Sequence, residues 1–301
     1  MPRRMTTLRK HSGIYAFIAV GLVYYTMFRI VPLIYNYLAF VDFNPVRGVF
    51  DSPFVGFKHF RRLFAFYDLQ LLLRNTFIIS GMRIAIGFWV PILFTLLLHD
   101  FQNPRVKRSL QTVIYFPHFI SWAVVAGITQ KILSPSSGII NQIVMSLGGQ
   151  SHHYMIDTSW FRWILVFQGV WKESGFGTII YLAALAAVSP DLYEAAKVDG
   201  CNKWQVMRHV NIPALIGTAV IMLLLAIGRM VNENFAQIFV MLSPTVYRVG
   251  DVFETYVFRV GIMEGQISYT TAVSLFKSIV SATMVLTANA IVTKLGYRGI
   301  F

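Results

Sequence analysis

The chain has 301 residues, of which 56% are hydrophobic and only 13% are charged, and its mean hydropathy is +0.60. This composition excludes an ordinary soluble domain, because the apolar residues exceed what one core can hide and lipid must solvate much of the surface. The formal net charge of +13 would suggest a nucleic-acid partner in a soluble protein, but the basic residues are grouped in particular loops, so membrane topology explains the charge and no nucleic acid is expected.

About six apolar stretches are long enough to cross roughly 30 Å of hydrocarbon as helices. They lie at about 13–40, 71–99, 109–133, 161–188, 213–243 and 269–295. The first is too long for the core of a signal peptide, so we interpret it as a retained span. Pro32, Pro91 and Pro117 predict kinks in three of the stretches. The expected fold class is all-α, a polytopic protein of the lipid bilayer in which residues 1–301 form a single transmembrane domain.

Lysine and arginine are concentrated on one side of the predicted spans. They lie in the N-terminal tail, in the connection at 100–108, in the loop after residue 189 and in the C-terminal tail. The side that is richer in these residues faces the cytoplasm. Both termini and the loop that contains Glu194 are therefore predicted to be cytoplasmic, in a bacterial-type cytoplasmic (inner) membrane. The single Cys201 lies in that loop and excludes an internal disulfide.

The connection between the fourth and fifth predicted spans is polar and has a clear helix pattern. Ser189 can cap a short helix that starts at Pro190 and ends at Asp199. Gly200 can adopt a positive φ, end that helix and turn the chain into a second helix at about 202–210. The pattern predicts two short helices joined by a sharp turn.

The first of these short helices has the features of a docking knob. Ala195 and Ala196 are small enough to let another surface approach the backbone, and Glu194 offers a carboxylate that an arginine can grip with two hydrogen bonds. We expect this knob to sit in a cleft of a partner. The alternative is an amphipathic loop that only lies on the membrane surface.

Residues 194–213, EAAKVDGCNKWQVMRHVNIP, resemble the EAA loop of the membrane-spanning subunits of binding-protein-dependent ABC importers. That loop follows the pattern E-A-A-x3-G-x9-I-x-L-P, and Val210 and Ile212 replace its Ile and Leu here. Residues 115–128, 171–200 and 255–276 are similar to the oligosaccharide and polysaccharide subgroup, which includes alginate importers. The resemblance implies that one set of residues couples the chain to an ATPase. This set is Glu194, Ala195, Ala196, Asp199, Gly200 and Pro213.

The resemblance also implies a set of partners. These are a second permease subunit in a heterodimer, two ATPase subunits, an external solute-binding protein and a saccharide substrate, while the sequence itself leaves a homodimer open. No G-x4-G-K-[ST] phosphate loop occurs in the chain. We therefore expect a transporter subunit rather than an enzyme, with no cofactor of its own and with ATP and Mg bound by the ATPase subunits.

Polar residues inside the predicted spans are candidates for a substrate path, because ionisable groups there usually face a bundle interior or a watery cavity. The candidates are Arg83, Trp171, Lys172, Glu173, Arg229, Asn232, Glu233 and Asn234. Arg229 and Glu233 are four residues apart on one predicted helix and are expected to pair. The basic residues inside the predicted spans, at 29, 74, 83, 172, 229 and 277, outnumber the acids at 173 and 233, which favours an anionic sugar such as a uronate. The alternative role is to join helices to one another or to the second permease.

Two other function classes have sequence requirements that differ from these features. An ion-coupled secondary transporter would need paired broken helices or inverted repeats, and the two halves of the sequence show no repeat. A membrane-embedded enzyme would need a convergent acid–base or metal-binding set. No catalytic or metal-binding residues are expected. The neighbouring His152 and His153 would point apart on most backbones and would not bind one metal ion together.

Overall fold

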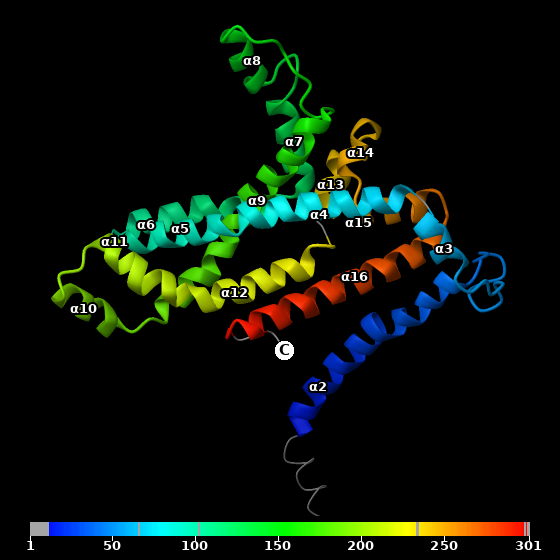
Figure 1. The fold of residues 1–301 in the computed structure, drawn as a ribbon, viewed down its shortest axis with the longest axis horizontal. Helices are drawn as coiled ribbons and strands as arrows, with labels where there is room; N and C mark the ends of the chain where they lie inside the picture. The colour runs from blue at the N-terminus through cyan, green and yellow to red at the C-terminus, as the bar shows by residue number, and fades with distance from the viewer. Residues whose placement is uncertain (1–11, 66, 102, 233–234, 298, 300–301) are drawn as a thin grey trace, which may run out of the picture. The chain divides into compact units, whose positions relative to one another are not determined.

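The computed structural model describes residues 12–65, 67–101, 103–232, 235–297 and 299. The described residues are mostly helical and contain no named strand, only the isolated bridges Val41–Phe54 and Asn44–Gly48. The chain divides into two compact units, whose helices are labelled in Figure 1. Unit 1 is Met1–Phe66 with Val257–Phe276, and unit 2 is Tyr67–Tyr256 with Lys277–Phe301.

Unit 1 begins with a long apolar helical run. The elements of unit 1 are α2 (Ser12–Tyr25), η1 (Thr26–Ile30), η2 (Val31–Phe40), α3 (Lys58–Ala65), η6 (Val257–Met263) and the first part of α16 (Ile267–Lys294). The run from Gly13 to Phe40 confirms the predicted span at 13–40. The regular α-helix ends at Tyr25, the wider turns of η1 follow, and the tighter turns of η2 begin at Val31, one residue before Pro32, which has no backbone donor.

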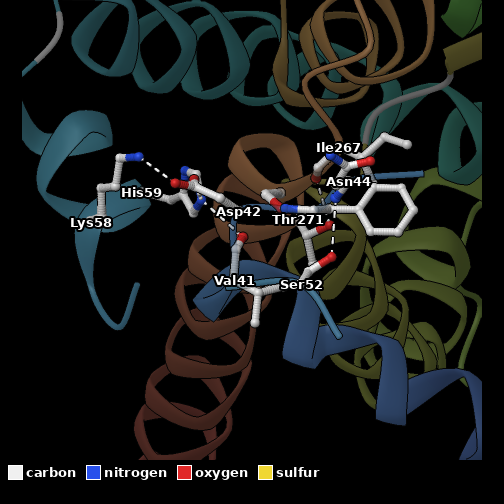
Figure 2. A network of polar contacts seen from close by, with 10 residues as sticks. Val41, Asp42, Asn44, Ser52, Lys58, His59, Ile267 and Thr271 are labelled. Atoms are coloured by element: carbon white, nitrogen blue, oxygen red, sulfur yellow. Dashed lines mark hydrogen bonds and ion pairs between the residues drawn. The ribbon is translucent and has the colours of Figure 1, made fainter. Parts of the chain in front are cut away.

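The loop between η2 and α3 is held by a polar network, which Figure 2 shows. The carboxylate of Asp42 accepts from Lys58 Nζ at 2.5 Å and lies 3.1 Å from His59 Nε2. The hydroxyl of Ser52 accepts from the Asn44 backbone N–H at 3.0 Å and donates to the Gly48 carbonyl at 2.6 Å. These bonds satisfy polar groups of a loop that forms no helix or strand of its own.

Unit 2 is built around one long helix, α9 (Thr158–Ala186), which packs against α4, α5, α6 and α12. The other elements are α4 (Tyr67–Gly87), α5 (Trp89–Asp100), α6 (Pro104–Tyr115), η3 (Phe116–Phe119), α7 (Trp122–Ile132), α8 (Ile139–Ser146), α10 (Pro190–Val198), α11 (Lys203–Val206), η4 (Met207–Asn211), α12 (Ile212–Arg229), α13 (Phe235–Met241), η5 (Pro244–Val246), α14 (Tyr247–Gly250) and α15 (Phe253–Tyr256). A buried apolar cluster joins α9 to α13 through Phe161, Leu165 and Ile238.

Four helical runs in the described residues are long and apolar enough to cross a membrane, or up to six if each of two bent pairs counts as one span. The four are Gly13–Phe40, Asp68–Asp100, Lys203–Arg229 and Ile267–Lys294. The predicted span at 109–133 is such a bent pair, with an angle of 99° between Pro104–Phe119 and Trp122–Ile132. The side chain of Ser121 accepts from Val124 N–H and starts a new helix at this bend.

The predicted continuous helix at 213–243 is wrong. α12 ends at Arg229, a turn follows in which Asn232 N–H donates to the Arg229 carbonyl at 2.9 Å, and α13 begins only at Phe235. Asparagine favours turns over helix interiors, which agrees with a break at Asn232. Glu233 and Asn234 lie outside the described residues. The predicted pairing of Arg229 with Glu233 is therefore not tested.

Candidate functional site

The order of contacts along α9 defines two ends of unit 2. Arg162 of α9 bonds to Asn75 of α4, Gly169 lies against Arg83, and the Thr178 carbonyl accepts from Thr95 of α5. The α4–α5 pair therefore runs parallel to α9. With 29 residues, α9 is about 43 Å long, so its start at Thr158 and the α10 helix after its end are separated by roughly the thickness of a membrane.

The short helix α10 follows α9 at an angle of 71° and has a defined start and stop. The hydroxyl of Ser189 accepts from the Asp191 N–H at 3.3 Å, and Pro190 occupies the first turn. The N–H of Asp199 donates to the Ala195 carbonyl at 2.9 Å, and Gly200 has a φ of +73°. The predicted short helix and its glycine stop are confirmed.

The second helix begins with reciprocal caps. The side-chain oxygen of Asn202 accepts from the Gln205 N–H at 2.9 Å, and the Gln205 side chain accepts from the Asn202 N–H at 2.7 Å. The chain then continues through the wide turn η4 into α12. Pro213, in the first turn of α12, has no N–H to donate to the preceding turn, which favours this local widening.

The loop is anchored to the rest of unit 2 by a few contacts. Tyr193 donates to Asn211 Oδ1 at 2.8 Å, and its ring lies 5.7 Å from the His99 ring at the end of α5. Lys203 pairs with Asp100 at 2.8 Å, and Figure 1 shows α11 beside the end of α5. These contacts fix α10 on one side and leave its other side open.

The open side carries the predicted docking residues. Glu194 and Ala195 are exposed, whereas the neighbouring Ala196 is buried within unit 2, since consecutive residues lie on different faces of a helix. Val198 is 88% exposed and Trp204 is 62% exposed, although both are apolar. A short, capped helix with a carboxylate beside exposed apolar side chains is suited to binding a complementary protein surface.

A chain of amide side chains crosses the middle of unit 2. Arg83 donates to Gln237 Oε1 at 2.6 Å, and Gln237 Nε2 donates to the Leu165 carbonyl at 2.8 Å and to Gln168 Oε1 at 3.1 Å. Gln168 in turn donates to Thr129 at 2.5 Å. These bonds join α4, α7, α9 and α13. Arg83 was predicted from the sequence, whereas the two glutamines were not; their neutral amides inside apolar stretches were the available signal.

A second polar cluster lies one turn further along α9. Lys172 is buried and donates to the His118 carbonyl, and its ammonium lies 5.3 Å from the centre of the Trp122 ring. Glu173 is 2.9 Å from His118 Nδ1 and 3.9 Å from Lys172 Nζ. The cluster thus holds the bend between η3 and α7, and His118 was missed in the sequence.

The remaining candidates are placed differently. Trp171, Arg229 and Asn232 are exposed, and within the described part of the chain they have no side-chain hydrogen bond or ion pair. The structure therefore engages Arg83, Lys172 and Glu173 in two clusters but does not bring the other three to them. A search of the described residues finds no group of three His, Cys, Asp or Glu side chains that could hold a metal ion.

Comparisons with known proteins give consistent results. A family model described as "Binding-protein-dependent transport system inner membrane component" matches residues 92–298. The polygalacturonan/rhamnogalacturonan transport system permease protein YteP of Bacillus subtilis is 38% identical over 299 residues, which cover 99% of this chain and 93% of that protein. Protein LplB of the same organism is also 38% identical, over 297 residues, with the same shares covered.

Solved structures resemble the chain over nearly its full length. A bacterial ABC transporter involved in the import of the acidic polysaccharide alginate contains a chain with a TM-score of 0.89 and 31% identity, covering 97% of this chain and 99% of that one. A bacterial alginate ABC transporter in complex with an alginate pentasaccharide-bound periplasmic protein gives 0.89 and 30%, covering 98% and 99%. The MetNI methionine transporter, at 0.52 and 15%, shares the fold.

Proposed function

The chain belongs to the family of binding-protein-dependent transport system inner membrane components, and we propose that it forms, with a second permease, the path by which fragments of an acidic polysaccharide enter the cell. It is a membrane-spanning subunit of an ABC importer of sugars or polysaccharides and not an enzyme, since ATP hydrolysis in such importers belongs to separate subunits.

The observation that carries the coupling part of this proposal is the exposed side of α10. Glu194 and Ala195 face outward from a helix that is capped at both ends and anchored through Tyr193, which contacts Asn211 of η4 and His99 of α5. Such a helix can transmit force, because it cannot rotate without breaking its anchors to α5 and η4. In the proposed complex, closure of two ATPases on ATP and Mg moves α10 and therefore tilts α9.

The uronate character of the substrate is supported by the relatives. YteP is described as a permease for polygalacturonan and rhamnogalacturonan, and the similar solved structures come from alginate importers. These polysaccharides share carboxylate-bearing sugars. The excess of arginine and lysine over acids among the residues predicted to lie inside the spans agrees with an anionic substrate.

The proposed assembly is one copy of this chain, a different second permease, two ATPase subunits and an external solute-binding protein. With α10 in the cytoplasm, both termini are cytoplasmic and the start of α9 faces the outside. Alternating access follows from rocking of the two permeases, and this chain performs no covalent chemistry.

The first experiment isolates the chain from native membranes in mild detergent and identifies its partners by mass spectrometry. We expect one ATPase polypeptide in two copies per complex, a second permease and, when saccharide is added, the binding protein. Recovery of the chain without any ATPase, under conditions that keep a known importer intact, would overturn the proposal in favour of an ion-coupled secondary transporter.

The second experiment tests the role of α10 in the reconstituted complex. Glu194→Lys should reduce oligogalacturonate-stimulated ATP hydrolysis and import at least about tenfold, because it replaces an acceptor for an ATPase cation by a like charge. Asp51→Lys is the matched control, an equal charge change at an exposed site in unit 1. Equal activity of the Glu194→Lys and Asp51→Lys complexes would remove α10 from the coupling role.

A further inference from the structure

Unit 2 contains a small hollow at the end where α4 and α9 begin. Its volume is about 190 Å³, and it is lined by Arg74 of α4, Thr158 of α9, and Arg248 and Val249 of α14. This volume is well below that of a pocket for a drug-sized ligand, so the hollow would admit one small unit of a larger molecule. Its lining combines two cations, one hydroxyl and one apolar side chain.

The two lining arginines lack partners within the described chain. Arg74 and Arg248 are exposed, and among the described residues neither makes a hydrogen bond or an ion pair. A third arginine lies next to the hollow, because Arg162 donates to the carbonyl of Val249, which lines it. Like charges gathered without a counter-ion repel one another. Binding of an anion would therefore reduce the repulsion among the arginines.

The third arginine is fixed by the protein itself. Arg162 Nε donates to the Val249 carbonyl at 3.0 Å, and its terminal nitrogen donates to Asn75 Oδ1 at 2.8 Å. Asn75 also donates to the Asp251 carbonyl at 3.0 Å. The α14 turn lies directly on α9, since a side chain at Gly250 would overlap the Phe161 ring. The hollow therefore has a rigid base.

The acids near the hollow in sequence are engaged elsewhere. Asp157 accepts from the Ser159 N–H at 2.6 Å and contacts His152 at 2.5 Å. Asp251 is buried and accepts from the Thr255 hydroxyl at 2.6 Å. Neither of these bonds directs a carboxylate to Arg74 or Arg248.

We propose that the hollow formed by Arg74, Thr158 and Arg248 is an entry subsite that binds the carboxylate of one uronate unit of the saccharide. The planar guanidinium groups match a carboxylate with paired hydrogen bonds, Thr158 can bond a sugar hydroxyl, and Val249 can contact a ring C–H face. The subsite rests on the proposed function, because the hollow lies at the opposite end of α9 from α10 and so opens to the outside only if α10 is cytoplasmic.

Kinetics of the reconstituted complex test the subsite. The probes are an oligogalacturonate and its carboxyl-reduced, neutral counterpart, and the readout is the KM for import. Arg74→Gln and Arg248→Gln should each raise the KM for the acidic probe about tenfold and leave that for the neutral probe unchanged. Arg47→Gln removes one exposed charge from unit 1 and should change neither. Arg248→Lys should restore only part of the affinity, because an ammonium lacks the planar fork.

Chemical footprinting in the absence of the binding protein gives a second readout. Phenylglyoxal modifies exposed arginines, and mass spectrometry of the wild-type complex in nanodiscs follows Arg74 and Arg248. We expect the oligogalacturonate to protect both residues and the neutral counterpart to protect neither. Arg105, which is exposed at the far end of unit 2, should be modified equally in all samples.

Several outcomes would overturn the subsite while leaving the importer function intact. An equal rise in KM for both probes would show that the arginines dock the binding protein instead. Protection by anionic lipid in the nanodisc, with no further effect of saccharide, would assign the hollow to a lipid phosphate. Wild-type kinetics in both glutamine variants would assign it no ligand at all. Failure of the wild-type complex to import either probe would instead count against the proposed function.

Discussion

The loop at 189–213 and the amide network around Gln237 use polar groups in opposite ways. In the loop, Ser189 bonds two residues along the chain and Asn202 three, and most side chains are exposed. In the network, Gln237 bonds to groups 69 to 154 residues away and is fully buried. Local bonds shape one surface, whereas distant bonds decide which helices stay together. We therefore expect changes in the network to cost stability, and changes in the loop to cost coupling.

The largest expected effect is that of Gln237→Leu. This change removes a second hydrogen bond from the Leu165 carbonyl, leaves the Gln168 amide oxygen without its partner and removes a bond to the Arg83 guanidinium, so the free energy of unfolding should fall by about 2–3 kcal/mol. Thermal unfolding in detergent measures it. Gln142→Leu, at an exposed glutamine of α8, should change the free energy of unfolding by less than about 0.5 kcal/mol. Equal losses in the two variants would erase the contrast between buried and exposed amides.

The next largest effect distinguishes backbone strain from a loss of coupling between ATP hydrolysis and import. Gly200 and Gly48 both have a positive φ, +73° and +82°, and a methyl group at either position would meet open space. Valine at either site should therefore cost a similar backbone strain of about 1–2 kcal/mol. Only Gly200→Val should also uncouple ATP hydrolysis from import, which transport assays of both variants measure. A loss of coupling in Gly48→Val as well would attribute the defect to general destabilisation.

A smaller effect is expected from the caps. Asn202→Ala removes an acceptor for the Gln205 N–H and should destabilise α11 by about 1 kcal/mol. Hydrogen exchange at the amides of α11 reports the change directly. Asn103→Ala, which removes a similar cap from α6, should leave exchange in α11 unaltered. Faster exchange throughout unit 2 in Asn202→Ala would mean that the loop is not a local unit.

The smallest effect is a dependence on pH at the start of α9. The Ser159 N–H first, and His152 second, hold the pKa of Asp157 below its usual range. A lowered pKa means that the carboxylate stabilises the fold above the unfolded pKa of about 3.9, and that this contribution is lost as the pH falls through the folded value. The unfolding midpoint of the wild type should thus exceed that of Asp157→Asn at neutral pH, and the gap should close on acidification. A gap that widens in acid contradicts this assignment.

Features that depend on neighbours in the chain could be predicted from the sequence. The edges of the first span, the cap at Ser189 and the stop at Gly200 depend only on the length of an apolar run and on a few adjacent residues. Pro117 correctly marked an irregular segment. The 99° bend, however, depends on Ser121 as a cap and on Lys172, which lies 54 residues beyond its partner carbonyl.

Features that depend on packing could not be predicted. The helix across 213–243 was predicted from its hydropathy. A hydropathy average gives the polar run at 229–234 too little weight against its apolar flanks. Gln237, which accepts from Arg83, comes from another helix far along the chain, and a neutral glutamine gives no charge pattern by which to find it. The hollow at Arg74 and Arg248 joins elements that are 174 residues apart by their numbers (248 − 74), and no local motif marks it.

The bond from Arg83 to Gln237 also constrains how the protein is made. The two residues are 154 positions apart, and a ribosome adds roughly 5–20 residues per second, so the acceptor amide emerges roughly 8–31 s after the guanidinium. During that interval the Arg83 guanidinium of α4 lacks the Gln237 side chain that later accepts its hydrogen bond. The nascent helix must therefore wait beside water, lipid head groups or the insertion machinery. Translation speed between these two codons thus sets how long the half-made chain is exposed to mis-insertion.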